Sequence, residues 1–277
     1  MRVVLPVLFL AACSPIGEPP EVEPDADWPS ILEAEPTDPA PLLAAERKRP
    51  WEPIKREATD LWVGNDRSLR ADIEPLANRL EEDGVLAGWG TGGGSAMFDM
   101  AVTEEEFDQL VEEQGWEIPA YVALTFVHPL QISAMSLAAK EIVRVMPVEP
   151  VRTVFQLEAL GQGRIFLENG CLWVGDPKGI RRLAFFHAET GVDVRDGELV
   201  LVDRTTTRTR GRVGEHFSWG APNPFNEEWE AAKELRAACG DADVTNVGNP
   251  EATTLFEARY PGAAEARPNP TPPLAAD

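Results

Sequence analysis

Residues 14–46 limit the fold more than any other feature of the sequence. They contain nine acidic residues, eight prolines and no basic residue. A segment of this composition buries too little apolar surface to offset the entropy that it loses on ordering. We therefore expect residues 13–58 to be a disordered, extended tether with a reach on the order of 100 Å, and we expect folded structure to begin near residue 59.

The chain begins with the layout of a secretory signal peptide. Arg2 precedes an apolar run over residues 3–10, which is too short to cross a bilayer of about 30 Å. The run ends in LAAC at residues 10–13, which resembles the lipobox of bacterial lipoproteins. The resemblance implies that residues 1–12 are removed and that acyl chains such as palmitate on Cys13 anchor the protein in a membrane. The alternative is an ordinary signal peptide in which Cys13 has no role.

Two further features bear on the membrane. Ser14 follows the lipobox cysteine, at the position where an aspartate usually favours retention in the inner membrane of Gram-negative bacteria. The resemblance therefore implies an exported lipoprotein of the outer membrane that faces the periplasm. Residues 118–139 carry no formal charge, but prolines and polar groups interrupt them. We expect a strand, a turn and a short helix there rather than a second membrane segment.

The formal net charge of −22 is distributed unevenly along the chain. Residues 59–150 contain 17 acidic and 5 basic residues, whereas residues 151–248 contain 15 acidic and 12 basic residues. A chain this acidic is unsuited to nonspecific binding of nucleic acid or anionic lipid over its whole surface. The expected partners are the membrane, reached through Cys13, and another envelope protein or an anionic envelope polymer, with no nucleic acid and no nucleotide.

The first folded region, residues 59–150, alternates helices with strands and predicts a small α/β unit. Apolar residues at helical spacing end at Gly84, and Pro75 places the helix start near Asp72 unless the helix is kinked. Thr103 and Glu106 form a capping box before a second helix. The pattern also predicts strands at residues 85–89, 96–102, 121–127 and 142–146, and a helix at residues 133–141.

The second region, residues 151–248, is predicted to be a small β-barrel or sandwich with one C-terminal helix at about residues 226–239. Asn169 and Gly170 suit a type I′ turn between two apolar strands. Asn226 is the expected N-cap of the helix. We therefore predict an α+β chain, with a tail over residues 249–277 that is disordered from about residue 261.

The sequences GRIFLENGC and RVGE in this region resemble a small β-domain of uncharacterised exported bacterial proteins. The resemblance covers about 80 residues and implies no activity.

The three cysteines predict one disulfide bond. If Cys13 is lipidated, Cys171 and Cys239 remain in an oxidising compartment. Cys171 opens the second strand of the predicted hairpin, and Cys239 lies in the last turn of the predicted helix on its apolar side. We therefore expect a Cys171–Cys239 bridge, the alternative being two buried free thiols.

Residues 88–97, GWGTGGGSAM, contain a G-x-G-x-x-G spacing. A dinucleotide loop must open a helix, but a strand is expected after this one. We therefore interpret the segment as a long, mobile hairpin loop. The alternative is a ligand-gripping loop that uses Trp89, Gly90, Gly92, Gly93, Gly94 and Ser95.

Four arginines occupy even-numbered positions between residues 204 and 212. On a single strand they would share one face, which could bind lipid phosphates, another anionic polymer or an acidic partner. The alternative is a solvated face that the protein's own carboxylates neutralise. The candidate anion-binding residues are Arg204, Arg208, Arg210 and Arg212.

No residue carries a recognisable catalytic or metal-binding motif. The three histidines lack partners at the spacing of metal ligands, and no nucleophile elbow or phosphate loop is present. The carboxylates are too numerous for spacing to single out an acid–base pair. The sequence therefore favours a non-catalytic envelope lipoprotein that binds or scaffolds, without a metal or cofactor. The alternative is an envelope hydrolase that acts on a wall or lipid component.

Overall fold

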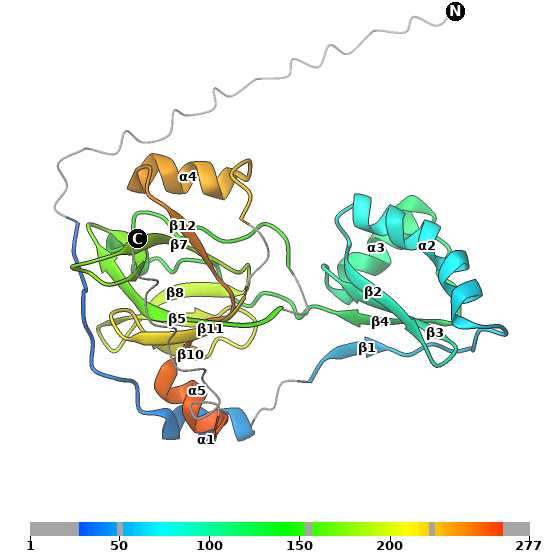
Figure 1. Ribbon diagram of the computed structural model, residues 1–277, viewed down its shortest axis with the longest axis horizontal. Helices are drawn as coiled ribbons and strands as arrows, with labels where there is room; N and C mark the ends of the chain where they lie inside the picture. The colour runs from blue at the N-terminus through cyan, green and yellow to red at the C-terminus, as the bar shows by residue number, and fades with distance from the viewer. Residues whose placement is uncertain (1–27, 49–51, 153–156, 222–224, 263–277) are drawn as a thin grey trace, which may run out of the picture.

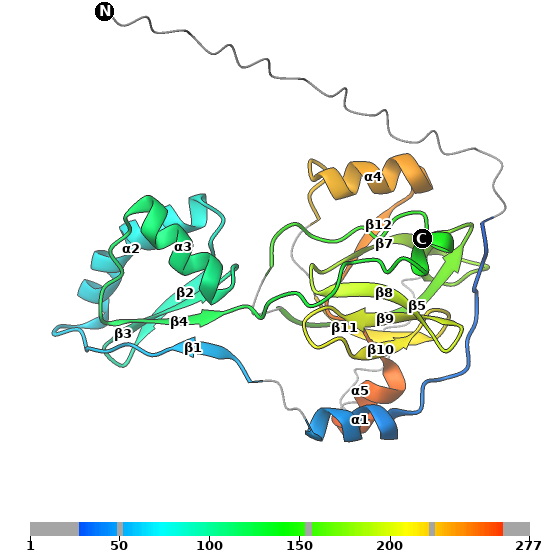
Figure 2. The same cartoon turned by 180° about the vertical axis from the view of Figure 1, so that it is seen from behind.

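The computed structural model describes residues 28–48, 52–152, 157–221 and 225–262 (Figure 1). These residues form five α-helices, one short 3-10 helix and thirteen strands in three sheets. The chain is therefore an α+β protein, as predicted, with two lobes that lie side by side (Figure 2). The signal peptide, Cys13, the tether before residue 28 and the tail after residue 262 lie outside the described residues.

Residues 28–38, which we call the strap, run along the second lobe and lead into α1 (Pro39–Lys48) (Figure 2). Ile31 pairs with Leu167 of β5 (Leu157–Glu168) through N–H···O bonds of 2.8 and 3.0 Å. The backbone N–H of Thr37 donates to the buried carboxylate of Glu215 at 2.7 Å. The tether prediction is therefore wrong for residues 28–48, and also for residues 52–58, where the strand β1 (Ile54–Arg56) lies. The average composition of the segment did not indicate that single residues, such as Ile31 and Thr37, form hydrogen bonds with the second lobe.

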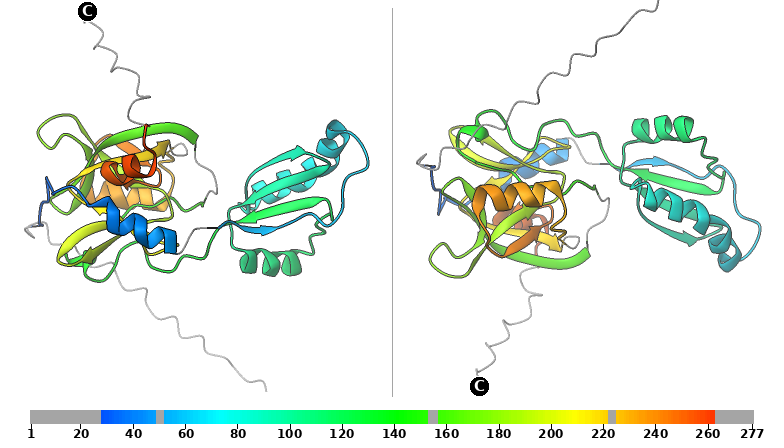
Figure 3. Two further views of the ribbon diagram at one scale, coloured as in Figure 1. Left: turned by 90° about the horizontal axis from the view of Figure 1, so that it is seen from below. Right: turned by 90° about the horizontal axis from the view of Figure 1, so that it is seen from above.

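The first lobe, residues 52–126, is inserted between two parts of the chain that belong to the second lobe (Figure 1). Its sheet has the order β1-β4-β3-β2, and only the β3–β4 pair is parallel. Both helices cover the same face of this sheet (Figure 3). The elements are β1 (Ile54–Arg56), α2 (Asp66–Glu82), β2 (Leu86–Gly92), β3 (Ser95–Met100), α3 (Glu104–Gln114) and β4 (Val122–Phe126).

Local signals define both helices of the first lobe. The side chain of Asn65 accepts a hydrogen bond from the Ser68 N–H, so α2 begins six residues before the predicted start and contains Pro75 in its interior. Thr103 and Glu106 form the predicted capping box of α3. The apolar sides of both helices close a core over the sheet that includes Leu80, Phe98, Phe107, Leu124 and Phe126.

Residues 127–152 belong to the second lobe, which corrects the predicted domain boundary at residue 150. Two isolated bridges, Met135 to Val192 and Val148 to Phe186, hold this segment on the sheets. The predicted helix at residues 133–141 is reduced to the 3-10 helix η1 (Ala139–Glu141), and the predicted strand at 142–146 is absent. Ala139 and Val143 are buried in the core, so packing rather than regular hydrogen bonding explains their apolar character.

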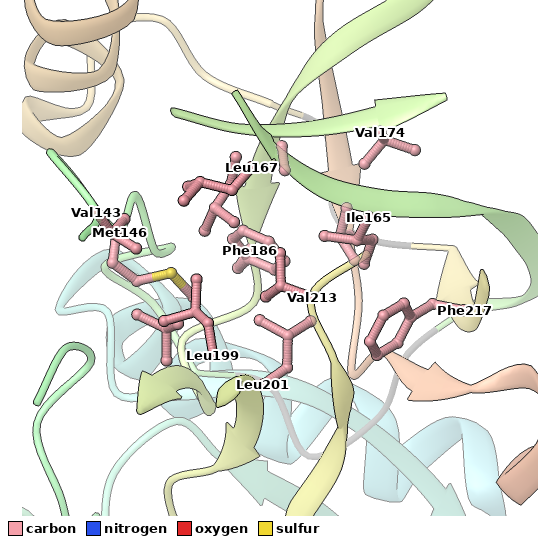
Figure 4. Packing of buried hydrophobic residues seen from close by; sticks show 14 of the residues in the cluster. Val143, Met146, Ile165, Leu167, Val174, Phe186, Leu199, Leu201, Val213 and Phe217 are labelled. Carbon is pink, nitrogen blue, oxygen red and sulfur yellow. The ribbon is translucent and has the colours of Figure 1, made fainter. Parts of the chain in front are cut away.

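The second lobe contains a six-stranded sheet, β12-β7-β6-β5-β11-β13, and a three-stranded sheet, β10-β9-β8. Neither sheet closes into a barrel, and side chains from both fill one core (Figure 4). The remaining elements are β6 (Cys171–Gly175), β7 (Arg181–Phe186), β8 (Thr190–Arg195), β9 (Glu198–Asp203), β10 (Thr209–Arg212), β11 (His216–Ala221), α4 (Glu230–Cys239), β12 (Val244–Val247), β13 (Glu251–Ala252) and α5 (Thr253–Arg259).

The predicted hairpin and disulfide are both present. Asn169 and Gly170 join β5 to β6 with φ angles of 51° and 74°, as a type I′ turn requires. Cys171 and Cys239 form a disulfide bond that ties the end of α4 to the first residue of β6. The helix begins at Glu230, because Asn226 instead forms a turn that ends at the Glu228 N–H.

Candidate functional site

A cavity of about 570 Å³ lies in the second lobe, where the chain returns from the first lobe. It is bounded by α1, the end of β4, the turn between β9 and β10, and α5. Figure 1 shows α1 and α5 side by side at the end of the lobe. Its charged lining comprises four arginines and three carboxylates: Arg47, Arg208, Arg210, Arg259, Glu46, Glu189 and Asp203.

Asp203 organises the turn between β9 and β10. One carboxylate oxygen accepts hydrogen bonds from the N–H groups of Thr205 and Thr206, at 2.8 and 2.9 Å, and from the Thr205 hydroxyl at 2.6 Å. The other oxygen binds the guanidinium of Arg210. Burial alone would raise the pKa of Asp203, but Arg210 and the turn donors lower it below its usual value. Asp203 is therefore ionised and fixed in position.

Arg259 connects the two helices that bound the cavity. Its guanidinium binds Glu46 of α1 and the buried carboxylate of Glu251, with an Nη1–Oε1 distance of 2.6 Å to the latter. Arg210 approaches the same Glu251 oxygen at 3.7 Å. Burial raises the pKa of Glu251, while Arg259 and Arg210 oppose that rise. One ion-pair network therefore joins α1, α5 and β10.

Glu189 faces Arg152 at the junction with the first lobe. Arg152 donates to a Glu189 carboxylate oxygen and to the carbonyl oxygen of His128. Burial raises the pKa of Glu189, although Arg152 opposes the effect. Burial also lowers the pKa of the neighbouring His187 to about 4, so its imidazole is neutral near pH 7.

The four candidate arginines do not form a stripe. Arg204 lies after β9 and donates to the carbonyl oxygens of Ile132 and Ala188, so it fixes the returning chain. Arg212 binds Glu198 at 2.6 Å and does not line the cavity. Arg208 and Arg210 do line it. The pattern fails because β10 is only four residues long and its register shifts between Thr209 and Gly211.

The glycine segment is a tight hairpin rather than a long, mobile loop. Trp89, Gly90 and Gly92 belong to β2, and Ser95 opens β3. Gly93 and Gly94 form the turn with φ angles of 62° and 81°. No helix follows, and a phosphate cradle at a helix N-terminus is therefore not formed.

Several cavity residues were not predicted to be functional. Glu46 was placed in the tether, while Arg259 and Tyr260 were placed in the tail. Nothing in either segment indicates that these residues line the same cavity. In the part of the chain that the structure describes, no group of three or more His, Cys, Asp or Glu side chains could hold a metal ion. No described helix has the length and apolar character needed to cross a membrane. Comparison with known protein families, curated proteins and solved structures finds no match for this chain.

Proposed function

We propose that this protein is a non-catalytic binding lipoprotein of the cell envelope, whose second-lobe cavity takes an anionic group of an envelope polymer or partner protein. The observation that carries the proposal is the charge of the cavity lining. Four arginines face three carboxylates there, although the whole chain has a net charge of −22. A local excess of guanidinium groups in a partly enclosed space favours phosphate or carboxylate ligands.

The pairing of the carboxylates supports the same proposal. Asp203 is bound by Arg210, Glu46 by Arg259, and Glu189 by Arg152. Arg47 is exposed at the end of α1 and takes part in no ion pair among the described residues. Arg210 and Arg259 are engaged by these carboxylates, so an entering anion meets Arg47 as a cationic group that no described carboxylate already neutralises.

The hydrolase remains the alternative, because one pattern favours it. Glu189 and Asp203 line the same cavity, and their pKa values are displaced in opposite directions, upward and downward. Such a divergence is typical of an acid–base pair. However, Asp203 accepts hydrogen bonds throughout its own turn and Glu189 is held by Arg152. Arg210 and the turn donors therefore account for the downward shift of the Asp203 pKa, and burial, which Arg152 opposes, accounts for the upward shift of the Glu189 pKa.

The lipid anchor is part of the proposal and is supported by the sequence alone. The LAAC lipobox at residues 10–13 implies an acylated Cys13, and Ser14 implies the outer membrane, facing the periplasm of a Gram-negative bacterium. The anchor would hold the cavity near the membrane surface, where anionic polymers and other envelope proteins are concentrated.

Replacing two arginines tests anion binding. The double variant Arg47→Gln/Arg208→Gln should bind tripolyphosphate or citrate at least about tenfold more weakly than the wild type in low-salt calorimetry, since charge-assisted hydrogen bonds contribute about 1.5–3 kcal/mol each. The control Arg67→Gln/Arg182→Gln removes the same charge from exposed positions outside the cavity and should change the affinity less than about twofold. Equal binding by the wild type and both variants would rule out the cavity as the anion site.

A further inference from the structure

The sheet of the first lobe has one face without a helix. Both α2 and α3 lie on the opposite face (Figure 3). Strand register places Gly90, Met97 and Ala123 in one row across the uncovered face, and Gly88, Asp99, Thr125 and Lys55 in the next. A groove of about 780 Å³ lies over these rows. Met97 is 51% exposed there.

The terminal strand of this sheet has one edge without a partner strand. β2 is a terminal strand, and in the described residues no strand pairs with its outer edge. Between Gly88 and Gly92 this edge carries no charged residue and no proline, whereas the opposite edge, β1, is three residues long and carries Lys55 and Arg56. Every second residue of an antiparallel edge strand directs its N–H and C=O groups outward. β2 therefore offers unused backbone donors and acceptors without the usual protection against strand addition.

The glycines of β2 leave space on the uncovered face. A Cβ atom placed on Gly88, Gly90 or Gly92 would meet nothing within 4 Å, and none of the three has the positive φ that favours glycine. Backbone conformation therefore does not explain why glycine occupies these positions. Glycine within a strand often marks a close approach by a ligand or another backbone.

Asp99 lies next to this space with its charge unpaired. Its register partner on β2 is Gly88, and among the described residues its carboxylate forms no ion pair and no hydrogen bond. Burial raises the pKa of Asp99. The surrounding residues 52–126 contain 17 acidic and 5 basic residues, a net charge of −12. The groove lining also includes Lys55, Arg56 and Glu57, but Lys55 and Arg56 belong to β1 at the opposite edge of the sheet. Next to β2, the charge that a ligand would meet on this face is therefore that of Asp99, which is complementary to a cation.

We propose that the first lobe binds an extended, cationic segment of a partner protein, which adds to the sheet as a fifth strand along β2 and places a lysine or arginine on Asp99. Neighbouring strands lie about 4.8 Å apart, so the added strand would be about 10 Å from β3. A long basic side chain of the added strand can reach across β2 to Asp99, because Gly88 and Gly90 place no side chain in its path. The backbone supplies affinity, and Asp99 supplies the preference for a cation.

Binding of two short peptides to the full chain tests this inference. The probe is a blocked octapeptide of alternating arginine and threonine, and its control has glutamate in place of arginine. Titration should shift the amide NMR signals of residues 88–92 with the arginine peptide only, most of all those of Trp89 and Thr91, whose N–H groups point away from β3. Equal binding of both peptides, no binding, or shifts confined to other residues would overturn the proposal.

Three variants separate strand addition from general attraction to an acidic lobe. Asp99→Asn should weaken binding of the arginine peptide about five- to tenfold, whereas Glu112→Gln, which removes one charge from the exposed side of α3, should change it less than about twofold. Gly90→Val should also weaken binding while leaving thermal unfolding unchanged, since the added side chain meets no neighbour. Equal effects of the Asp99 and Glu112 variants, or full binding by the Gly90 variant, would contradict the proposal.

Discussion

Charged residues that are buried or half-buried join parts of the second lobe that are distant in sequence. Glu215 accepts hydrogen bonds from both the N–H and the hydroxyl of Thr37, 178 positions away. Arg259 binds Glu46 across 213 positions. Removing Thr37 would leave the buried carboxylate of Glu215 without these donors, and an unsatisfied buried polar group costs about 1–3 kcal/mol. These pairs therefore position the strap and α1 as specifically as an apolar core would.

His187 gives the second lobe a testable pH dependence. Burial lowers the pKa of His187 from 6.5 to about 4. Between these two pH values the imidazole is therefore protonated in the unfolded chain and neutral in the folded chain. The histidine therefore costs no stability above pH 6.5 and costs stability progressively as the pH falls from 6.5 to 4. Between pH 6.5 and 5.5 its contribution should change by about 1 kcal/mol.

Urea unfolding at several pH values measures this change. The wild type should lose more free energy of unfolding between pH 6.5 and 5.5 than His187→Gln does, and the difference isolates His187 from the carboxylates that titrate nearby. His216→Gln, at an exposed histidine, should behave as the wild type does. Parallel pH profiles for the wild type and the His187 variant would show that the buried imidazole is not the cause.

At the scale of elements, the disulfide joins two parts that otherwise share a small apolar cluster. Leu235 of α4 and Phe185 of β7 both belong to this cluster. The bond closes a loop with a sequence separation of 68. Chain-entropy arguments assign such a loop about 4 kcal/mol of stabilisation, a large share of the 5–15 kcal/mol that is usual for a domain.

Removing the bridge should therefore loosen α4 first. The variant Cys171→Ala/Cys239→Ala should lose about 2–4 kcal/mol of stability in the second lobe. Hydrogen exchange should accelerate in α4 and remain unchanged in α2, which belongs to the other lobe. Unaltered protection of α4, together with an unaltered unfolding midpoint, would mean that packing alone holds the helix.

Elements with a local signal were predictable from sequence, and elements that depend on distant partners were not. Asn169-Gly170 specified a hairpin, and Thr103 with Glu106 specified a helix start, because each signal acts within four residues. The short strand β12 forms only by parallel pairing with β7, which lies about 60 residues earlier in the chain. The helix α5 packs against α1, which lies near the other end of the chain. The cavity was missed for the same reason, since its walls come from segments interpreted as tether and tail.

At the scale of the whole molecule, the first lobe is an insertion in the sequence of the second lobe. The strap and α1 precede the first lobe, and residues 127–262 follow it, yet both parts pack together (Figure 2). The two lobes have separate apolar cores. Each lobe therefore carries its own candidate surface, the cavity in one and the β2 edge in the other.

The proposed anchor predicts where the whole molecule resides. Cys13→Ser should abolish incorporation of labelled palmitate and move the folded protein from the membrane fraction to the soluble fraction. Cys171→Ala/Cys239→Ala, which keeps Cys13, should remain acylated and membrane-bound. Absence of acyl label on the wild-type protein would refute the anchor.

The strap has a mechanical consequence for a protein held in this way. Fourteen residues separate Cys13 from Trp28, so the anchor lies within about 50 Å of the strap, half the reach expected from an unfolded segment. Tension from the membrane would arrive first at the bonds from the Gly170 N–H to the Pro29 carbonyl and from the Asn169 N–H to the Ser30 hydroxyl. It would then reach the Ile31–Leu167 bridge and the bond from the Ala34 N–H to the Gly214 carbonyl. All of these lie ahead of α1, so Glu46 at the cavity would carry no load until they broke. The strap thus isolates the cavity from movements of the anchor.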